Sequence, residues 1–252
     1  MKLLSIARDL KRRRARERQT RFVAEGIRSV EELLRSPLTV DGALVSPALG
    51  ATPRGAALLE SMRAASVTIL DVSQTDFASA SSTDAPQGVL AIGQIPERDV
   101  SALTFTHRPR VLVLDGVQDP GNVGTLLRTA AAFGVDATLA MPDTVDLWNA
   151  KVVRSAMGAL FRHQALACDW DAFDALRTTQ HLQCWAADAS GEPVDQVRGE
   201  RAMALVVGNE GAGLSNQTRA RADRRVAIPI SADVESLNVA VAAGILLYQL
   251  RP

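Results

Sequence analysis

A glycine and an arginine one helical turn apart mark the first stretch of the chain that could do chemistry. Residues 115–128 read D-G-V-Q-D-P-G-N-V-G-T-L-L-R, and a helix is predicted to follow the turn at Pro120. Gly124 and Arg128 are four residues apart, so they share one face of that helix. Glycine inside a helix costs roughly 1 kcal/mol against alanine, and close approach of a ligand or another backbone would explain it. The alternative is tight helix–sheet packing beside a surface arginine.

A glycine-rich stretch, residues 205–214, places an amide and a carboxylate where the backbone is exposed. It reads L-V-V-G-N-E-G-A-G-L and contains Gly208, Gly211 and Gly213. Such glycines indicate unusual backbone angles or close backbone contacts. Their spacing is reversed from the dinucleotide fingerprint G-x-G-x-x-G, and no G-K-[ST] is present, so a P-loop is excluded. Asn209 and Glu210 make this loop a stronger candidate site than glycines alone would.

Polar residues open an otherwise apolar helix in the third stretch, residues 228–248. The stretch reads I-P-I-S-A-D-V-E-S-L-N-V-A-V-A-A-G-I-L-L-Y. From Leu237 onward the helix is apolar nearly all round, so we expect it to be buried on every side. Ser236 is well explained as a helix cap. Asn238 is harder to explain by capping, which makes it a candidate for contact with a ligand at the helix N-terminus.

Each of these stretches follows a predicted strand of an α/β fold. The run R-V-L-V-L-D at 110–115 is typical of a strand buried on both faces of a parallel sheet. Further strands are predicted at 137–140, 183–187, 203–207 and 225–228, with helices near 150–157, 172–178 and 237–250. Ligands of open α/β sheets bind at the carboxyl edge of the strands, so the three stretches are expected at that edge.

The N-terminal part alternates in the same way and forms a separate predicted domain. A basic helix is predicted at about 3–18, strands at 21–25, 42–45, 67–72 and 88–92, and helices at 27–34 and 54–64. Residues 93–109 lose this periodicity and contain Pro96 and Pro109. We therefore expect a first domain at 1–93, a linker at 94–109 and a second domain at 110–252.

A basic excess at the N-terminus is hidden by a net charge of zero. The first 18 residues hold eight basic and two acidic side chains, among them Arg12, Arg13, Arg14 and Arg16. A local excess of this size can attract a polyanion such as nucleic acid. The alternatives are a solvated helix face or a frayed tail.

The remaining composition excludes several classes of protein. With 47% hydrophobic and 22% charged residues, the 252-residue chain is long enough to bury a core and is not disordered. The longest candidate span, 239–248, is far shorter than the roughly twenty residues a membrane helix needs, and no secretory signal is expected. Cys168 and Cys184 lack metal spacing and fit a reducing, cytoplasmic compartment. The scattered His107, His163 and His181 are expected to be structural or exposed, so no metal is predicted.

Together the three stretches resemble the SpoU (TrmH-like) family of RNA ribose 2′-O-methyltransferases of the SPOUT class. The family's first motif, N-x-G-x-x-x-R, is matched by Asn122, Gly124 and Arg128, and its second, G-N-E-G-x-G-[LM], by Gly208 to Leu214. The third, I-P-M-x-G-x-x-x-S-L-N-V-[SA]-V-A, is matched from Ile228 to Ala242 except at Ile230, Ala232 and the commonly serine position Ala240. Residues 151–160, which include Arg154, are similar to the segment that the family carries between its first two motifs.

The resemblance implies a fold that the residues alone would not predict. It implies an α/β catalytic domain whose parallel sheet ends in a C-terminal trefoil knot, although knots are nearly absent from proteins. Residues 10–14, 22–28 and 87–89 are similar to the family's smaller L30e-like α/β domain, which binds the RNA substrate. The family also implies a homodimer with active sites at its interface.

The resemblance further implies the cofactor and the roles of individual residues. S-adenosylmethionine would be held mainly by the backbone of Gly208, Ile228 and Leu237, with Gly211 and Gly213 in the same loop. The catalytic residues would be Arg128, Asn122, Glu210 and Asn238, and the RNA-binding residues Arg12, Arg13, Arg14, Arg16 and Arg154. Because arginine keeps its proton in proteins, we interpret Arg128 as a clamp on a phosphate or the developing alkoxide. Glu210 or an RNA phosphate would take the proton, and the two asparagines would orient the nucleotide.

Several functions remain open at this point. The separate N-terminal domain favours ribosomal RNA over tRNA as substrate. A non-catalytic RNA-binding relative of the same fold is the first alternative, against which the four intact polar residues argue. A nucleotide-dependent oxidoreductase on an ordinary doubly wound sheet is the second, and it lacks the G-x-G-x-x-G fingerprint after any early strand.

Overall fold

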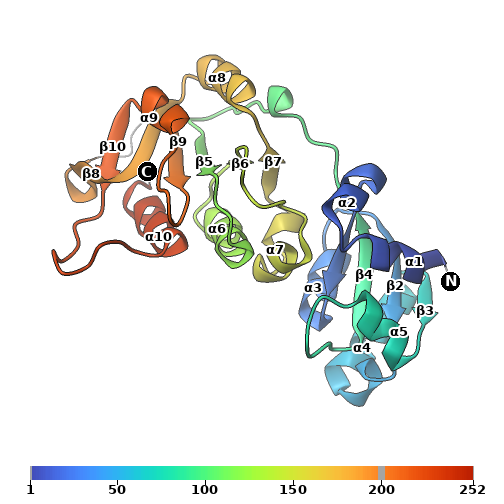
Figure 1. The fold of residues 1–252 in the computed structure, drawn as a ribbon. Coiled ribbons are helices and arrows are strands. Elements are labelled where there is room, and N and C mark those ends of the chain that lie inside the picture. The colour runs from blue at the N-terminus through green and yellow to red at the C-terminus, as the bar shows by residue number, and fades with distance from the viewer. Residues whose placement is uncertain (1, 198–201, 252) are drawn as a thin grey trace. The chain divides into compact units, whose positions relative to one another are not determined.

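The structure is a computed structural model that describes residues 2–197 and 202–251, and it divides into two compact units (Figure 1). Unit 1 comprises residues 1–97 together with 148–162, and unit 2 comprises 98–147 together with 163–252. Residues 148–162, which the sequence analysis assigned to the second domain, thus group with the first unit by their contacts. The chain therefore passes between the units three times.

Unit 1 is built on a four-stranded mixed sheet in the order β1-β4-β2-β3. Its strands are β1 (Arg21–Glu25), β2 (Val40–Val45), β3 (Ile69–Asp71) and β4 (Val89–Gln94). Its helices are α1 (Lys2–Asp9), α2 (Arg13–Gln19), α3 (Ile27–Leu34), α4 (Pro53–Ala64) and α5 (Gln74–Ala80). β4 is antiparallel to both of its neighbours, and β2 and β3 run parallel. One core of the unit gathers Leu10, Leu44, Phe77, Leu90 and Ile92 under α1 and α5.

The basic N-terminal segment is two helices, not the single helix predicted over 3–18. α1 ends at Asp9 and α2 begins at Arg13. Arg16 of α2 is buried, and its Nη1 donates to the carbonyl oxygens of Leu10 (2.8 Å) and Lys11 (3.0 Å). The guanidinium therefore satisfies the carbonyls that the break leaves without helical partners.

The returning segment 148–162 is held in unit 1 by aromatic packing. It contains α7 (Ala150–Ser155) and a 3₁₀ turn at Ala159–Phe161. The ring of Phe22 on β1 lies 4.5 Å from that of Trp148 and 5.6 Å from that of Phe161, between ring centroids. Arg162 adds an ion pair of 2.9 Å with Glu32 of α3. Because aromatic contacts bury large apolar areas, this segment forms part of the core of unit 1.

Unit 2 is a six-stranded, wholly parallel sheet in the order β10-β8-β9-β5-β6-β7. The strands are β5 (Arg110–Asp115), β6 (Ala137–Ala140), β7 (Gln164–Ala167), β8 (Gln183–Pro193), β9 (Met203–Gly208) and β10 (Arg224–Ala227). The helices are α6 (Pro120–Ala132), α8 (Trp170–Thr179), α9 (Asn216–Arg221) and α10 (Val239–Gln249). Every residue of β5 is buried, as its unbroken apolar run predicted.

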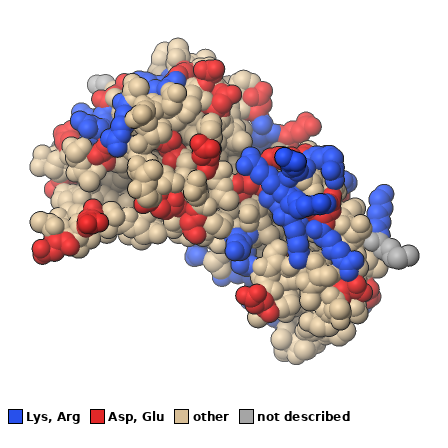
Figure 2. Space-filling view, in the orientation of Figure 1, with Lys and Arg blue, Asp and Glu red and all other residues tan. Residues whose placement is uncertain are grey.

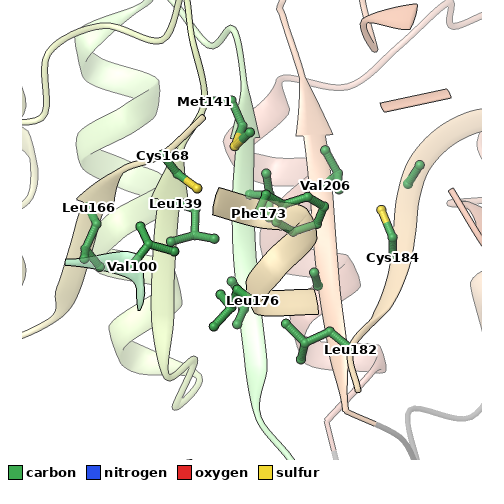
Figure 3. Packing of buried hydrophobic residues seen from close by; sticks show 14 of the residues in the cluster. Val100, Leu139, Met141, Leu166, Cys168, Phe173, Leu176, Leu182, Cys184 and Val206 are labelled. Carbon is green, nitrogen blue, oxygen red and sulfur yellow. The ribbon is translucent and has the colours of Figure 1, made fainter. Parts of the chain in front are cut away.

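One hydrophobic core fills the α8 side of this sheet (Figure 3). Phe173 and Leu176 of α8 pack against Leu139, Val206 and neighbouring strand residues. Val100, which lies in the predicted linker, is buried in the same core from a 3₁₀ turn at Val100–Ala102. The segment before β5 is therefore partly a structural element of unit 2. Among the helices that the structure describes, none has the length and apolarity to cross a bilayer.

Candidate functional site

The three stretches singled out in the sequence meet at the carboxyl edge of the unit 2 sheet. Asp115 at the end of β5 pairs with Gly208 at the end of β9, and Ile228 directly follows β10. A cavity of about 570 Å³ opens there, within the range of small-molecule sites. Its lining includes all five residues expected to hold a cofactor, Gly208, Gly211, Gly213, Ile228 and Leu237. The expectation that a ligand site lies at this edge therefore has a cavity to support it.

The loop after β9 is held in shape by its own asparagine. The backbone groups of Asn209 and Gly213 exchange two hydrogen bonds of 2.9 and 3.0 Å. Asn209 Oδ1 accepts from the amides of Gly211 (2.9 Å) and Ala212 (2.8 Å), and its Nδ2 donates to the carbonyl of Gly116 (2.8 Å). Asn209 thus links the loop to the end of β5, a structural role that sequence reasoning did not assign to it.

Gly208 is required by this loop before any ligand is considered. A Cβ at position 208 would lie 2.5 Å from the carbonyl carbon and oxygen of Gly213 and 2.7 Å from the amide nitrogen of Leu214. Gly213 itself has φ +70°, in the left-handed region that favours glycine. Two of the three glycines are therefore explained by the loop's backbone.

A buried carboxylate that sequence reasoning missed anchors the other end of the loop. Asp115 is 5% exposed, and its Oδ2 accepts from the amide of Ser215 (2.7 Å) and from Thr218 Oγ1 (2.7 Å). These bonds join the end of β5 to the first turn of α9. The signal in the sequence was an aspartate closing an otherwise apolar strand, because a buried charge at such a place needs donors.

Side chains from all three stretches form one hydrogen-bonded chain. Asn238 Nδ2 donates to Asn122 Oδ1 at 2.9 Å, and Asn122 Nδ2 donates to Glu210 Oε1 at 3.0 Å. Glu210 also accepts from the amides of Gln118 (3.2 Å) and Asp119 (3.1 Å). Three of the four expected catalytic residues therefore lie together, and each comes from a different stretch.

The surroundings of Glu210 fix its charge state. Partial burial works to raise the pKa of this carboxyl, but the hydrogen bonds from Asn122 and from backbone amides outweigh it and lower the pKa below 4.5. Glu210 is thus a carboxylate at neutral pH with its acceptor sites occupied. A group of this kind positions its donors well and accepts a proton poorly, so the expectation that it takes the hydroxyl proton is disfavoured.

Asn238 caps the last helix, contrary to the sequence interpretation. Its Oδ1 accepts from the amides of Ala240 (2.9 Å) and Val241 (3.3 Å), so α10 begins at Val239 and Ser236 lies outside the helix. The same side chain uses its Nδ2 to hold Asn122. An asparagine can do both because its amide carries an acceptor and two donors.

The composition of α10 predicted burial on every side, but one face of this helix is exposed. Val241, Ile245 and Tyr248 are 52%, 37% and 46% exposed. They line an open groove of about 600 Å³ that also includes Thr129 and Phe133 of α6. These three residues recur at helical spacing, so they form one continuous exposed face of α10.

Arg128, the fourth expected catalytic residue, is exposed on α6. Arg128 is not one of the described residues that line the 570 Å³ cavity. Gly124, one turn before it, is buried, in line with close packing at that position. Arg128 is the residue before Thr129, which belongs to the exposed apolar groove.

The expected RNA-binding arginines have different surroundings. Lys and Arg side chains gather over α1 and α2 (Figure 2). Arg12 pairs with Asp9 and Arg13 with Glu17 (2.7 Å), while Arg14 is exposed. Arg16 is buried with its guanidinium bound to backbone carbonyls, which assigns it a structural role. Arg154 lies on α7 and lines a separate cavity of unit 1.

The fold and the site together define a two-unit protein of the SPOUT class. Residues 109–248 match the SpoU rRNA Methylase family, and residues 5–91 match the MRM3-like substrate binding domain. The chain belongs to the SpoU rRNA Methylase family.

Relatives of known name cover most of the chain. The 23S rRNA (guanosine(2553)-2′-O)-methyltransferase RlmP of Bacillus subtilis is 34% identical over 95% of this chain and 92% of its own length. The 23S rRNA (guanosine-2′-O-)-methyltransferase RlmB of Bordetella pertussis is 38% identical over 65% of this chain and 69% of its own. The crystal structure of AviRb from Streptomyces viridochromogenes with AdoMet shares the fold, with a TM-score of 0.87 at 24% identity over 98% and 96% of the two chains.

Proposed function

We propose that this protein transfers a methyl group from S-adenosylmethionine to a ribose 2′-hydroxyl of ribosomal RNA. The observation that carries the proposal is the chain Asn238–Asn122–Glu210 beside the cavity at the sheet edge. The names of RlmP and RlmB, both 23S rRNA 2′-O-methyltransferases, support ribosomal RNA over tRNA. The intact polar residues speak against a non-catalytic relative, and the family match leaves no support for an oxidoreductase.

The residues of the cavity fit S-adenosylmethionine. Backbone of the 208–214 loop and the apolar side chains of Ile228 and Leu237 offer a surface for an adenosine, and the carboxylates of Asp188 and Glu235 suit a ligand with a sulfonium and an ammonium group. Hydrogen bonds from Ser190 lower the pKa of Asp188, so this carboxyl is ionised at neutral pH. When bound, the cofactor supplies an electrophilic methyl group for in-line displacement.

The protein's own residues then orient the acceptor and stabilise charge. Asn122 and Asn238 are fixed by each other and by Glu210, so they can orient a nucleotide without reorganising. Because arginine side chains do not act as bases in proteins, Arg128 serves as a clamp for a phosphate or for the developing alkoxide. With the acceptor sites of Glu210 occupied, an RNA phosphate or water is the better acceptor for the hydroxyl proton.

Arg128 would reach the site through a homodimer. Its position beside the exposed apolar groove, and its absence from the described lining of the cavity, support a second protomer covering α10 and bringing the two together. Apolar surface of this kind at regular helical spacing is typical of a protein interface. We place the enzyme in the cytoplasm, where free buried cysteines such as Cys168 and Cys184 persist.

The test is a methylation assay with radiolabelled cofactor and ribosomal RNA, followed by mapping of the modified ribose. Arg128→Ala is expected to lower the methylation rate by on the order of 10²-fold, the scale for losing one charge-stabilising donor. Cofactor affinity, measured by calorimetry, should be nearly unchanged. Arg128→Lys separates the two roles: a clamp that needs the planar fork fails with lysine, whereas a base recovers at high pH. Near wild-type turnover of Arg128→Ala would remove this residue from the mechanism.

A further inference from the structure

A second cavity lies entirely within unit 1 and shares no lining residue with the cavity of unit 2 that is proposed to hold the cofactor. It measures about 280 Å³ and is lined by residues of β1, α3, the 81–88 loop and α7. Its lining includes Arg28 and Ser29 of α3 and Arg154 of α7. Arg28 and Ser29 are thus joined by an arginine more than a hundred residues further along the chain, on the segment that returns to unit 1.

The two arginines of this cavity form no ion pair with a described residue, although, after the hydrogen bond from Arg54, the charge of Arg28 also contributes to lowering the pKa of the nearby Glu31. Most arginines in the described chain hold a carboxylate or a carbonyl, as Arg54 holds Glu31 and Arg162 holds Glu32. Arg28 and Arg154 are both exposed, and neither forms a hydrogen bond or ion pair with a described residue. Two unpaired guanidinium groups on one cavity repel each other unless an anion lies between them.

The start of α3 adds donors on the same wall. Gly26 is the N-cap and supplies no side-chain cap, and only the amide of Ile27 is taken, by Gln87 Oε1 at 2.9 Å. The next amides of the first turn have no helical acceptor, and the helix dipole favours negative charge there.

An independent observation at the same wall is a buried hydroxyl without a partner. Ser29 is 6% exposed, and its Oγ has no hydrogen-bond partner among the described residues. A buried polar group in this state calls for an explanation. Ser29 lines the cavity, so rotation of its hydroxyl toward the cavity would let a bound anion provide the missing partner.

Glu25 is the one carboxylate among the described residues that line the cavity, and its hydrogen bonds go to the 81–83 loop. Glu25 accepts from Ser81 Oγ, from the amide of Ser82 (2.8 Å) and from Thr83 Oγ1 (2.8 Å). Its charge is therefore already solvated by the 81–83 loop.

We infer that this cavity binds a backbone phosphate of the RNA substrate, with Arg28, Arg154, Ser29 and the α3 N-terminus as its donors. Arginine forks and helix N-termini are both common phosphate donors. The inference rests on the proposed function for the presence of RNA. It adds a specific contact, a phosphate held between α3 and α7, to the RNA-binding role that the resemblance implies for Arg154.

The test is filter binding of radiolabelled 23S rRNA transcript to the full-length protein over a potassium chloride series. The double variant Arg28→Gln/Arg154→Gln is expected to bind about tenfold more weakly and to flatten the salt slope by about 0.7–0.9, the value for one phosphate. The matched control is Arg35→Gln/Arg63→Gln, which removes the same charge from unit 1 at exposed arginines paired within their own helices. It should keep most of the affinity and the slope. Equal weakening by both doubles would overturn the inference, because bulk charge would then explain the effect.

Ser29→Val provides a second, uncharged readout. Because Ser29 Oγ has no protein partner, its loss should not lower the melting temperature, whereas rRNA affinity should fall about fivefold, the size of one hydrogen bond. Unchanged affinity in both Ser29→Val and the arginine double would overturn the site.

Two further arms separate the causes of failure. If the wild type methylates and binds rRNA and the arginine double variant binds it equally well, the phosphate site alone is wrong. If the wild type binds no rRNA, both the proposed function and the site are wrong. Polyglutamate is the competing anion. If Arg28→Gln/Arg154→Gln weakens polyglutamate binding but leaves rRNA binding unchanged, the cavity binds an acidic peptide and the inference is overturned.

Discussion

At the scale of single residues, Glu210 shows how a site can look like acid–base chemistry and be built for positioning. Three N–H donors, from Gln118, Asp119 and Asn122, converge on its carboxylate. They hold the loop before α6 against the loop after β9. These hydrogen bonds lower the pKa of the Glu210 carboxyl, so it is a poor base near neutral pH.

Glu210→Gln is therefore expected to lower the methylation rate by on the order of tenfold at every pH, without changing the shape of the pH–rate profile. The glutamine amide presents one oxygen to three donors and turns an NH₂ toward the others, so Asn122 is no longer held. Asp233→Asn, an exposed acid of the 231–236 loop outside the described cavity lining, is the charge-matched control and should keep the wild-type rate. Loss of an acid limb in Glu210→Gln alone would restore Glu210 as the base.

His163 provides a prediction about stability. It is 7% exposed, and its Nε2 lies 2.7 Å from Thr138 Oγ1. Burial first, and then the charge of Arg98, lower the pKa of His163 to about 4. Between pH 6.5, the ordinary pKa of histidine, and pH 4, the unfolded chain binds a proton at His163 that the native state does not bind. The free energy of unfolding therefore falls as the pH falls through this window.

Relative to His163→Asn, the wild type should lose about 3 kcal/mol of unfolding free energy between pH 7 and 4. Urea unfolding at several pH values, followed by a signal from unit 2, measures the difference. Thr138→Val is the control: it removes the hydrogen bond at a cost of about 1 kcal/mol and keeps the pH dependence, because burial is the leading cause. A difference that does not vary with pH would contradict the assignment.

At the scale of elements, the loop after β9 shows that a glycine motif can serve the protein's own backbone. The contacts of a Cβ at position 208 are with Gly213 and Leu214, whereas at Gly211 the nearest atom is Asn209 Oδ1 at 3.7 Å. Both glycines line the cavity. The two positions therefore separate loop geometry from contact with the cofactor.

Gly208→Ala is expected to destabilise the cofactor-free protein by about 1–3 kcal/mol, the cost of overpacking, and to abolish most cofactor binding. Gly211→Ala should leave the unfolding free energy nearly unchanged, since 3.7 Å is an ordinary contact. Thermal unfolding of both free variants and calorimetry with S-adenosylmethionine measure the two effects. A Gly208→Ala protein as stable as the wild type would show that the loop adapts and that its glycine serves the ligand alone.

The elements that the sequence predicted best are those with a strong local pattern. β1, β5, β6 and α3 begin and end where their hydrophobic runs do. α5, α9 and β7 were missed: α9 has six residues that depend on the Ser215 cap and on the Arg221–Asp174 pair, and β7 is a four-residue edge strand with only its two central residues buried. Short elements stabilised by tertiary contacts leave little periodicity to detect.

The candidate site divides in the same way. The motifs located the cavity, because strand ends of a parallel sheet must share an edge. The bonds among Asn122, Glu210 and Asn238 span 88 and 116 residues, and no local pattern encodes them. Asn238 was predicted to be free for a ligand because capping was assigned to Ser236, and two residues of error in the helix start exchanged those roles. The trefoil knot stays a prediction from the family resemblance.

At the scale of the whole molecule, the exposed apolar face of α10 supports the proposed homodimer. Its mean composition is that of a core helix, yet Val241, Ile245 and Tyr248 are exposed. Arg251 stacks over the Tyr248 ring at 3.8 Å from its centroid, which leaves a polar rim at one end of this face. A two-fold dimer across it would place identical α10 helices against each other.

Such a dimer predicts complementation between two inactive variants. If Arg128 of one protomer serves the cavity of the other, Arg128→Ala and Asn238→Ala proteins are each inactive alone. Unfolded, mixed in equal amounts and refolded, they form half mixed dimers, each with one site of two intact, so about a quarter of wild-type activity should return. Refolding each variant alone is the control for recovery, and light scattering reports the dimer. A mixture with no more activity than its components would show that Arg128 acts on its own protomer's cavity or not at all, since a composite site must be rebuilt by exchange.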